Sequence, residues 1–204
     1  MDRTVLALTL WQRLESWDRW LFLKINGHWT LPFLDSVFPY VRDPFFWAPI
    51  YIFILLFVNL NYGRKGLWWS LAFICTVALT DGIGSKIFKE GFQRLRPCNE
   101  PDLAGHVRLL LRYCGTGFSF VSNHAANHFG MATFAVLTFR GTFKKWIYVA
   151  YAWALLVAYA QIYVGVHYPA DVLGGAGLGV LAGVLTATVF HRKWGTIQLE
   201  QQPR

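Results

Sequence analysis

Long apolar segments alternate with short polar ones along the chain. A helix needs about 20 mainly apolar residues to cross a hydrocarbon core of about 30 Å. Five segments of the sequence reach or approach that length, namely 44–63, 66–85, 125–139, 146–170 and 172–190. The second is interrupted only by Asp81, and the uncharged residues 115–124 can lengthen the third. The pattern predicts an all-α integral membrane protein, built as a bundle of about five transmembrane helices.

The N-terminal region mixes apolar and charged positions. Apolar side chains recur there at helical spacing with charges between them, at Leu10, Leu14, Trp17 and Leu21. Such spacing is typical of an amphipathic helix in the headgroup region, and a sixth transmembrane helix is the alternative. No small-residue cleavage site follows a basic start, so we expect no cleavable signal peptide. We expect one membrane domain, 1–204, with an interfacial region (1–43), a transmembrane bundle (44–191) and an extracytoplasmic loop (89–121).

Polar residues gather at one end of the predicted bundle. If the segments cross the membrane in turn, their ends alternate between its faces, and one face collects Lys89, Arg96, His124, His167 and Asp171. The other face carries mainly basic residues: Arg64, Lys65, Arg140, Lys144, Lys145, Arg192 and Lys193. Basic residues favour the cytoplasmic side. This puts the C-terminus in the cytoplasm and the polar cluster on the periplasmic side of a bacterial inner membrane, or outside.

The composition agrees with a membrane protein and narrows its partners. The chain is 55% hydrophobic and 15% charged, whereas ordinary soluble domains have about 25% charged residues. The net charge of +8 is spread over loops and forms no dense basic tract. We therefore expect membrane lipids, and not nucleic acid, as partners. Cys98 and Cys114 fall in the predicted outer loop, where an oxidising compartment allows a disulfide; two free cysteines are the alternative.

His167 and Asp171 form the most informative local pattern. Asp171 follows His167 by four positions, with Pro169 between them. A carboxylate so placed can hold one ring nitrogen of the histidine and leave the other free for nucleophilic attack. The alternative is an interfacial histidine beside an aspartate that caps a helix starting at Pro169.

Two further fragments would complete an anion site. Lys89 and Arg96 supply cations that suit the oxygens of a phosphate; a lysine reaching the interface and a loop arginine are the alternative reading. Ser122, Asn123 and His124 precede an apolar helix, whose N-terminal N–H groups favour an anion. His124 can also donate a proton to a departing oxygen. Simple helix capping by Ser122 or Asn123 is the alternative.

A metal site is the weaker interpretation of the same residues. His124 and His128 are four positions apart, as zinc ligands on one helix face sometimes are. No Cys, Asp or Glu stands close to them in sequence, and the nearby cations would repel a metal. The fragments together predict a phosphoryl-transfer site that needs no metal or other cofactor. Asp81, about two helical turns from Lys89, is expected to support this site through hydrogen bonds.

The same residues resemble the signature of the type 2 phosphatidic acid phosphatase superfamily, which are integral-membrane lipid phosphatases. That signature has three motifs, Lys-x6-Arg-Pro, Pro-Ser-Gly-His and Ser-Arg-x5-His-x3-Asp. This sequence matches them at Lys89, Arg96 and Pro97, at Ser122 and His124, and at His167 and Asp171. The resemblance implies that His167 attacks phosphorus, Asp171 orients it and His124 protonates the leaving group. Lys89, Arg96 and Ser122 would hold the phosphoryl oxygens, with Asn123 beside them.

The third motif departs from the family pattern at its first two positions. Ala160 and Gln161 stand where the family has Ser and Arg. A charge-assisted contact contributes about 1.5–3 kcal/mol and a tenfold rate change corresponds to about 1.4 kcal/mol, so loss of this contact predicts roughly ten- to a hundredfold lower activity. Three explanations are open: a natural variant with altered activity, another cation such as Arg94 in the missing place, or an introduced substitution.

The resemblance implies a metal-independent lipid phosphatase that works through a phosphohistidine. Its expected substrate is a phosphate or diphosphate ester of a lipid at the outer leaflet. Undecaprenyl diphosphate is the first choice, and phosphatidylglycerol phosphate, phosphatidic acid and the lipid A phosphates stay open. A lipid-to-lipid phosphotransferase and a catalytically impaired lipid-binding protein are the alternatives. Gly175, Gly179 and Gly183 make one face of the last segment smooth, either for packing within the bundle or for a homo-oligomer.

Overall fold

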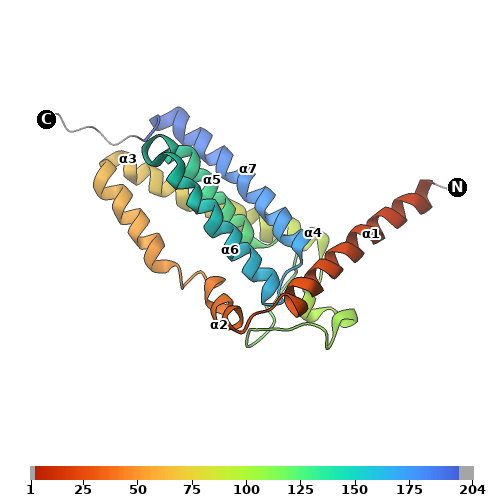
Figure 1. Cartoon of the computed structure of the whole chain (residues 1–204). Coiled ribbons are helices and arrows are strands. Elements are labelled where there is room, and N and C mark those ends of the chain that lie inside the picture. Colours follow the sequence, from red (N-terminus) through yellow and green to blue (C-terminus); the bar gives the residue numbers. More distant parts are fainter. Residues whose placement is uncertain (1–2, 198–204) are drawn as a thin grey trace.

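The computed structural model describes residues 3–197, and this part of the chain is all-helical with no strand. Its elements, in chain order, are α1 (Arg3–Leu23), the π-helical turn η1 (Lys24–His28), α2 (Pro32–Val41), α3 (Ala48–Ile83), the π-helical turn η2 (Gly84–Lys89), α4 (Glu90–Phe92), the 3₁₀ turns η3 (Pro97–Asn99) and η4 (Pro101–Leu103), α5 (Asn123–Phe143), the 3₁₀ turn η5 (Lys144–Tyr148), α6 (Val149–Tyr163) and α7 (Pro169–Trp194). Helices α3, α5, α6 and α7 form the bundle (Figure 1).

Helix α3 is a hairpin of two antiparallel legs. It reverses at Gly63, whose φ of 52° and ψ of −129° suit glycine because it has no Cβ. The side-chain amide of Asn59 donates to the Ser70 hydroxyl across the hairpin at 2.8 Å. The two legs correspond to the predicted segments 44–63 and 66–85, although the first leg starts only at Ala48.

Helix α7 packs closely on α5 through its glycine face. A Cβ at Gly175 would overlap the carbonyl oxygen of Ser122, and one at Gly179 would overlap that of Ala126. The absence of side chains at these positions lets the two helix backbones touch. The face is therefore used within the bundle, which is the packing alternative that the sequence left open.

Some predicted helix boundaries are wrong. Residues 115–122 do not lengthen the third segment, because Ser122 caps the start of α5 by accepting from the backbone N–H of Ala125 at 3.4 Å. The helix instead runs on to Phe143. Helix α6 ends at Tyr163 and not at residue 170, because the chain turns at Gly165, which has a φ of 93°.

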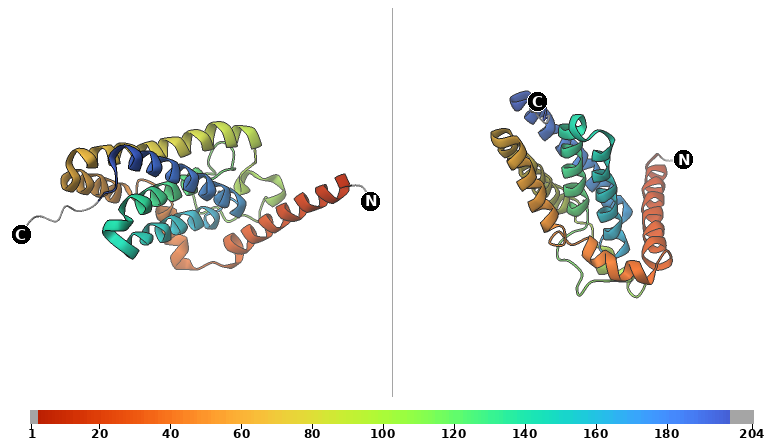
Figure 2. Two further views of the ribbon diagram at one scale, coloured as in Figure 1. Left: turned by 90° about the horizontal axis from the view of Figure 1, so that it is seen from above. Right: turned by 60° about the vertical axis from the view of Figure 1, so that its left-hand side comes forward.

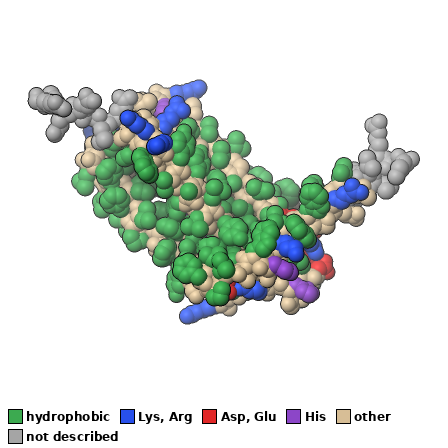
Figure 3. Space-filling view, viewed as in Figure 1, with side chains coloured by type: hydrophobic (Ala, Val, Ile, Leu, Met, Phe, Trp, Pro, Cys, Tyr) green, Lys and Arg blue, Asp and Glu red, His purple; other side chains and the backbone are tan. Residues whose placement is uncertain are grey.

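Three stretches of the described chain are long and apolar enough to cross a membrane, by length and composition. They are Ala48–Leu103, Asn123–Tyr163 and Pro169–Trp194. The first turns back at Gly63 and the second near Lys144, which has a φ of 51°. Hydrophobic side chains cover the middle of the face in Figure 3, whereas Lys and Arg side chains lie toward its two ends. These stretches agree with the membrane bundle that the sequence predicts.

Helix α1 projects away from the bundle, as Figures 1 and 2 show. Its apolar residues Leu10, Leu14 and Trp17 are exposed. Nothing in residues 3–197 covers them. An interfacial position for this helix stays a prediction, as does the division of the chain into an interfacial region and a bundle.

One end of the bundle is closed by a network around Asn26. The fully buried side-chain amide of Asn26 donates to the carbonyl oxygens of Arg108 and Tyr163, both at 2.8 Å. The Arg108 side chain pairs with Asp35 of α2 at 2.6 Å. A disulfide joins Cys98 and Cys114 in the same loop, which is the bonded alternative of the two that the sequence allowed. These contacts hold the long loop against α2 and the end of α6.

Candidate active site

A cavity of about 1150 Å³ opens between the hairpin α3, helix α5 and the loops at this end of the bundle. Five of the eight predicted site residues line it, namely Lys89, Arg96, Asn123, His124 and His167. Ser122, Gln161 and Asp171 are fully buried and do not line it. The opposite part of the wall is apolar and includes Leu55, Phe73, Ile74, Val77 and Met131. The cavity therefore combines charged and polar side chains with an apolar wall.

His167 lies on the turn between α6 and α7, which Gly165 and Pro169 shape. Its Nε2 is 3.1 Å from a terminal nitrogen of Arg96, Nη1. Because a guanidinium can only donate, Nε2 accepts and the ring proton sits on Nδ1. The side chain is 2% exposed, and this burial holds the pKa of His167 to about 4. The ring is therefore neutral, with the Nε2 lone pair on the side of the cationic wall.

Asp171 lies beside the other ring nitrogen of His167, Nδ1. Its Oδ2 lies 3.5 Å from Nδ1 of His167 and accepts from the Ser119 hydroxyl and from the backbone N–H of Tyr168. The Ser119 oxygen is itself 3.2 Å from Nδ1 of His167. Asp171 thus orients the histidine and caps α7 at once, so the two roles considered for it are compatible. Ser119 belongs to no motif, and the sequence analysis missed it.

A chain of charges ties Asp171 to helix α1. Arg94 donates to Oδ1 of Asp171 at 2.8 Å and to Asp18 of α1 at 2.6 Å. The other oxygen of Asp18 accepts from the backbone N–H of Ala170, in the first turn of α7, at 2.8 Å. Both terminal nitrogens of Arg94 are engaged by carboxylates, so Arg94 does not stand in for the missing arginine of the third motif.

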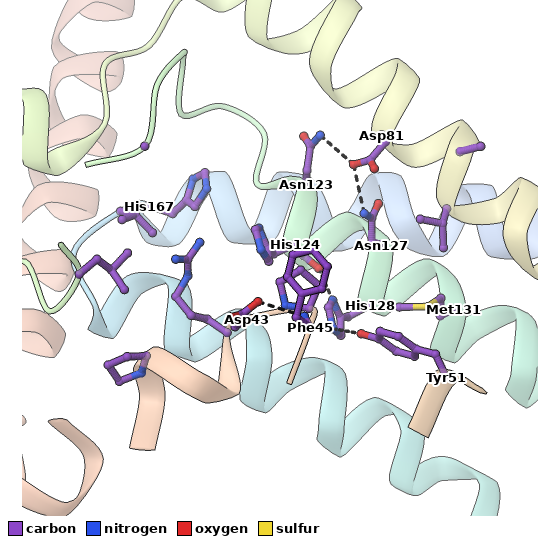
Figure 4. A pocket seen from close by; sticks show the side chains of 18 of the residues that line it. Asp43, Phe45, Tyr51, Asp81, Asn123, His124, Asn127, His128, Met131 and His167 are labelled. Atoms are coloured by element: carbon purple, nitrogen blue, oxygen red, sulfur yellow. Dashed lines mark hydrogen bonds between the residues drawn. The ribbon is translucent and has the colours of Figure 1, made fainter. Parts of the chain in front are cut away.

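His124 lies on the cavity wall at the start of α5. Figure 4 shows it and His167 on the same cavity, contributed by different segments. The side-chain amide of the neighbouring Asn123 donates to Asp81, at 2.9 Å, and to Ser85, at 2.8 Å. Asp81 also accepts from Asn127 at 3.1 Å. Asp81 thus supports the start of α5 through hydrogen bonds, as the sequence predicted.

Both ring nitrogens of His128 contact protein groups other than the ring of His124. Its Nδ1 is 2.7 Å from the backbone oxygen of His124, and its Nε2 is 3.1 Å from the Tyr51 hydroxyl. Within residues 3–197 no group of three or more His, Cys, Asp or Glu side chains could hold a metal ion. His128 is therefore held by a backbone oxygen of its own helix and by Tyr51 of α3.

Gln161 has an unexpected partner. Its side-chain oxygen accepts from Nε of Arg42, at 3.2 Å, although the two residues are 119 positions apart. Arg42 follows α2 directly and lines the cavity together with Arg96 and Lys89. Gln161 itself is fully buried, and its side-chain nitrogen has no hydrogen-bond partner in the described residues. No local pattern in the sequence pointed to Arg42.

Comparison with known proteins identifies several relatives of this chain. Residues 66–195 match the model of the PAP2 superfamily. A lipid A 4'-phosphatase from Bacteroides thetaiotaomicron is 33% identical over 184 residues, which cover 89% of this chain and 80% of that protein. One from Porphyromonas gingivalis is 31% identical over 174 residues, covering 85% and 72%. The crystal structure of a transmembrane PAP2-type phosphatidylglycerolphosphate phosphatase from Bacillus subtilis has a TM-score of 0.65 at 26% identity, covering 89% of this chain and 88% of that one.

Proposed function

Because the chain belongs to the PAP2 superfamily and is a phosphoric ester hydrolase that acts on lipids, we propose that it removes the 4'-phosphate of lipid A through a phosphohistidine. The observation that carries the proposal is the shape of the cavity. It brings His124, His167 and several cations together, and apolar residues form much of the remaining wall. Such a space suits a phosphorylated headgroup whose acyl chains stay in the bilayer.

In the proposed reaction His167 attacks phosphorus through Nε2. Arg96 and Lys89 neutralise the phosphoryl oxygens as charge develops on them. His124 gives a proton to the leaving sugar oxygen, and water then hydrolyses the phosphorus–nitrogen bond to release phosphate and free histidine. Asp171 keeps the proton on Nδ1 of His167, so that Nε2 is the attacking atom.

The proposed substrate follows from the relatives and from the size of the cavity. Both lipid A 4'-phosphatases match this chain over most of its length. The cavity of about 1150 Å³ exceeds the roughly 300–1,000 Å³ of most ligand pockets, which favours a large headgroup. Undecaprenyl diphosphate, the first choice from the sequence, is therefore second here. The proposed location is the bacterial inner membrane, with the cavity open to the periplasm.

Phosphate release by the purified protein tests the proposal. The substrates are lipid A, phosphatidylglycerol phosphate, phosphatidic acid and undecaprenyl diphosphate in detergent micelles, with a chelator present. We expect lipid A to be hydrolysed best, His167→Ala to abolish release and His124→Ala to lower it about 100- to 10,000-fold. His106→Ala, at an exposed loop position, is the control and should keep wild-type activity.

Four results would contradict parts of this proposal. Wild-type activity in His167→Ala would rule out the phosphohistidine, and loss of activity with the chelator would rule out the metal-free mechanism. Radiolabelled phosphate that appears on an acceptor lipid, and not in water, would identify a phosphotransferase. Lipid binding without phosphate release would identify a lipid-binding protein.

A further inference from the structure

Arg42 lines the cavity and contacts Gln161, which stands at the position where the third motif of the family has arginine. Position 161 carries an amide, and the oxygen of that amide holds Nε of Arg42 at 3.2 Å. A neutral residue at position 161 thus fixes a guanidinium that comes from another part of the chain. Burial and the charge of Arg96 lower the pKa of Arg42, and the carboxylate of Asp43 raises it.

Packing of α2 on α6 sets the position of Arg42. The buried ring of Phe38 lies edge-on to Tyr163, with the ring centres 4.8 Å apart. Val41, the last residue of α2, is buried, and its carbonyl oxygen accepts from the indole nitrogen of Trp47 at 2.6 Å. The chain on both sides of Arg42 is therefore held, and the side chain projects from a fixed backbone.

The charge around Arg42 favours an anion. No carboxylate lies within ion-pair distance of Arg42 in the described residues, since its side chain bonds only to Gln161. Arg96 and Lys89 line the same cavity and add like charge. Neighbouring cations in a desolvated space are unfavourable until an anion enters between them. A phosphoryl group, with three oxygens to share, satisfies all three cations.

We propose that Arg42 binds the phosphoryl group of the substrate in place of the arginine missing from position 161, and that Gln161 acts as a positioning residue for it. This inference rests on the proposed function. It adds a phosphate-binding residue, Arg42, that belongs to none of the three motifs. It also explains how a site without the arginine of the third motif keeps its full number of cations. Gln161 then affects substrate binding only through its hydrogen bond with Arg42.

Substitution and exchange of the two residues test this inference. In phosphate release from lipid A micelles, we expect Arg42→Gln to lower kcat/KM about ten- to a hundredfold and Arg42→Lys to lower it less. The double variant Arg42→Gln with Gln161→Arg returns a guanidinium to the cavity from the other side, and should recover much of the loss. Arg112→Gln is the matched control, because Arg112 is an exposed cation at the same cavity, and it should cost less than about threefold.

Binding of inorganic phosphate gives a second readout that does not need turnover. Phosphate, compared with chloride at equal ionic strength, should raise the unfolding temperature of the wild type and of Arg112→Gln, but much less that of Arg42→Gln. The unfolding temperatures without phosphate also show whether each variant is folded.

The outcomes separate the two proposals. An active wild type whose kcat/KM is unchanged by Arg42→Gln, or reduced equally by Arg112→Gln, overturns the role of Arg42 and leaves the phosphatase intact. A wild type that releases no phosphate from any lipid phosphate fails the proposed function, while the phosphate-binding comparison still decides the role of Arg42. Equal stabilisation of wild type and Arg42→Gln by phosphate would overturn that role as well.

Discussion

In the proposed reaction His167 can attack phosphorus only through an unprotonated nitrogen, and burial keeps its ring unprotonated. Its pKa is about 4 in the folded protein, against about 6.5 in an unfolded chain. Between these values the unfolded state binds more protons than the folded state, so the free energy of unfolding falls as the pH falls through this window. A shift of this size corresponds to about 3 kcal/mol, lost by the time the pH reaches about 4.

We therefore expect a steeper fall in unfolding temperature between about pH 7 and about pH 4.5 in the wild type than in His167→Asn. Asparagine keeps a polar side chain beside Arg96 and Ser119 but does not titrate. The measurement is thermal unfolding of the detergent-solubilised proteins at a series of pH values. Equal slopes in wild type and His167→Asn would mean that burial does not depress the pKa of His167.

Sequence motifs predicted the residues that are proposed to react and missed some of the residues that contact them. His167, His124, Lys89 and Arg96 stand at fixed spacings in local patterns, and all four reach one cavity. Arg42 reaches the same cavity only because α2 packs on α6, and nothing near it in sequence signals that contact. Ser119 was missed for the same reason, since its contacts with His167 and Asp171 join segments about fifty residues apart.

Helices α5 and α7 hold the two halves of the candidate site, and their spacing depends on glycine. A methyl group at Gly179 would overlap the backbone of α5 at Ala126, which cannot move aside as a side chain can. We expect Gly179→Ala to lower the free energy of unfolding by about 1–3 kcal/mol. Activity should fall too, because α7 begins beside Asp171 and α5 beside His124.

Gly177→Ala is the matched control for this prediction. Gly177 is in the same helix, and a Cβ there would meet nothing within 4 Å. Alanine forms helix better than glycine, so this change should leave activity intact and stabilise the fold by up to about 1 kcal/mol. Denaturant unfolding and phosphate release of the two variants measure the difference. A Gly179→Ala protein as stable and as active as Gly177→Ala would show that close packing is not required.

Apolar segments were easier to predict than their ends. The two legs of α3 and the helices α5, α6 and α7 fall within or close to the predicted segments. The ends depend on single residues that stop or turn the backbone, such as Ser122 and Gly165. Hydropathy does not detect these residues. For that reason the apolar pattern extends the predicted helices over residues 115–122 and 164–168, which lie in loops instead.

The two ends of the molecule differ in chemistry, and this gives a test of its orientation. The candidate site and the disulfide lie at one end. The other end holds the contacts of Thr142 with Ile197 and of Lys65 with Thr196, where several basic residues cluster in sequence. With this end in the cytoplasm, green fluorescent protein fused to the C-terminus should fluoresce in cells, and alkaline phosphatase fused there should be inactive. The reverse pair of results would place the candidate site in the cytoplasm.

The cavity has a consequence for how the protein meets its substrate. Apolar side chains from both legs of α3 line it together with the cations, and in a bilayer we expect this apolar wall to meet the lipid tails. A lipid can enter sideways without leaving its leaflet. The quantity that sets the encounter rate is then the number of substrate molecules per area of membrane, and not their number per volume of water. Abundant neutral lipids dilute the substrate in that plane, so the composition of the leaflet itself sets how fast the protein works.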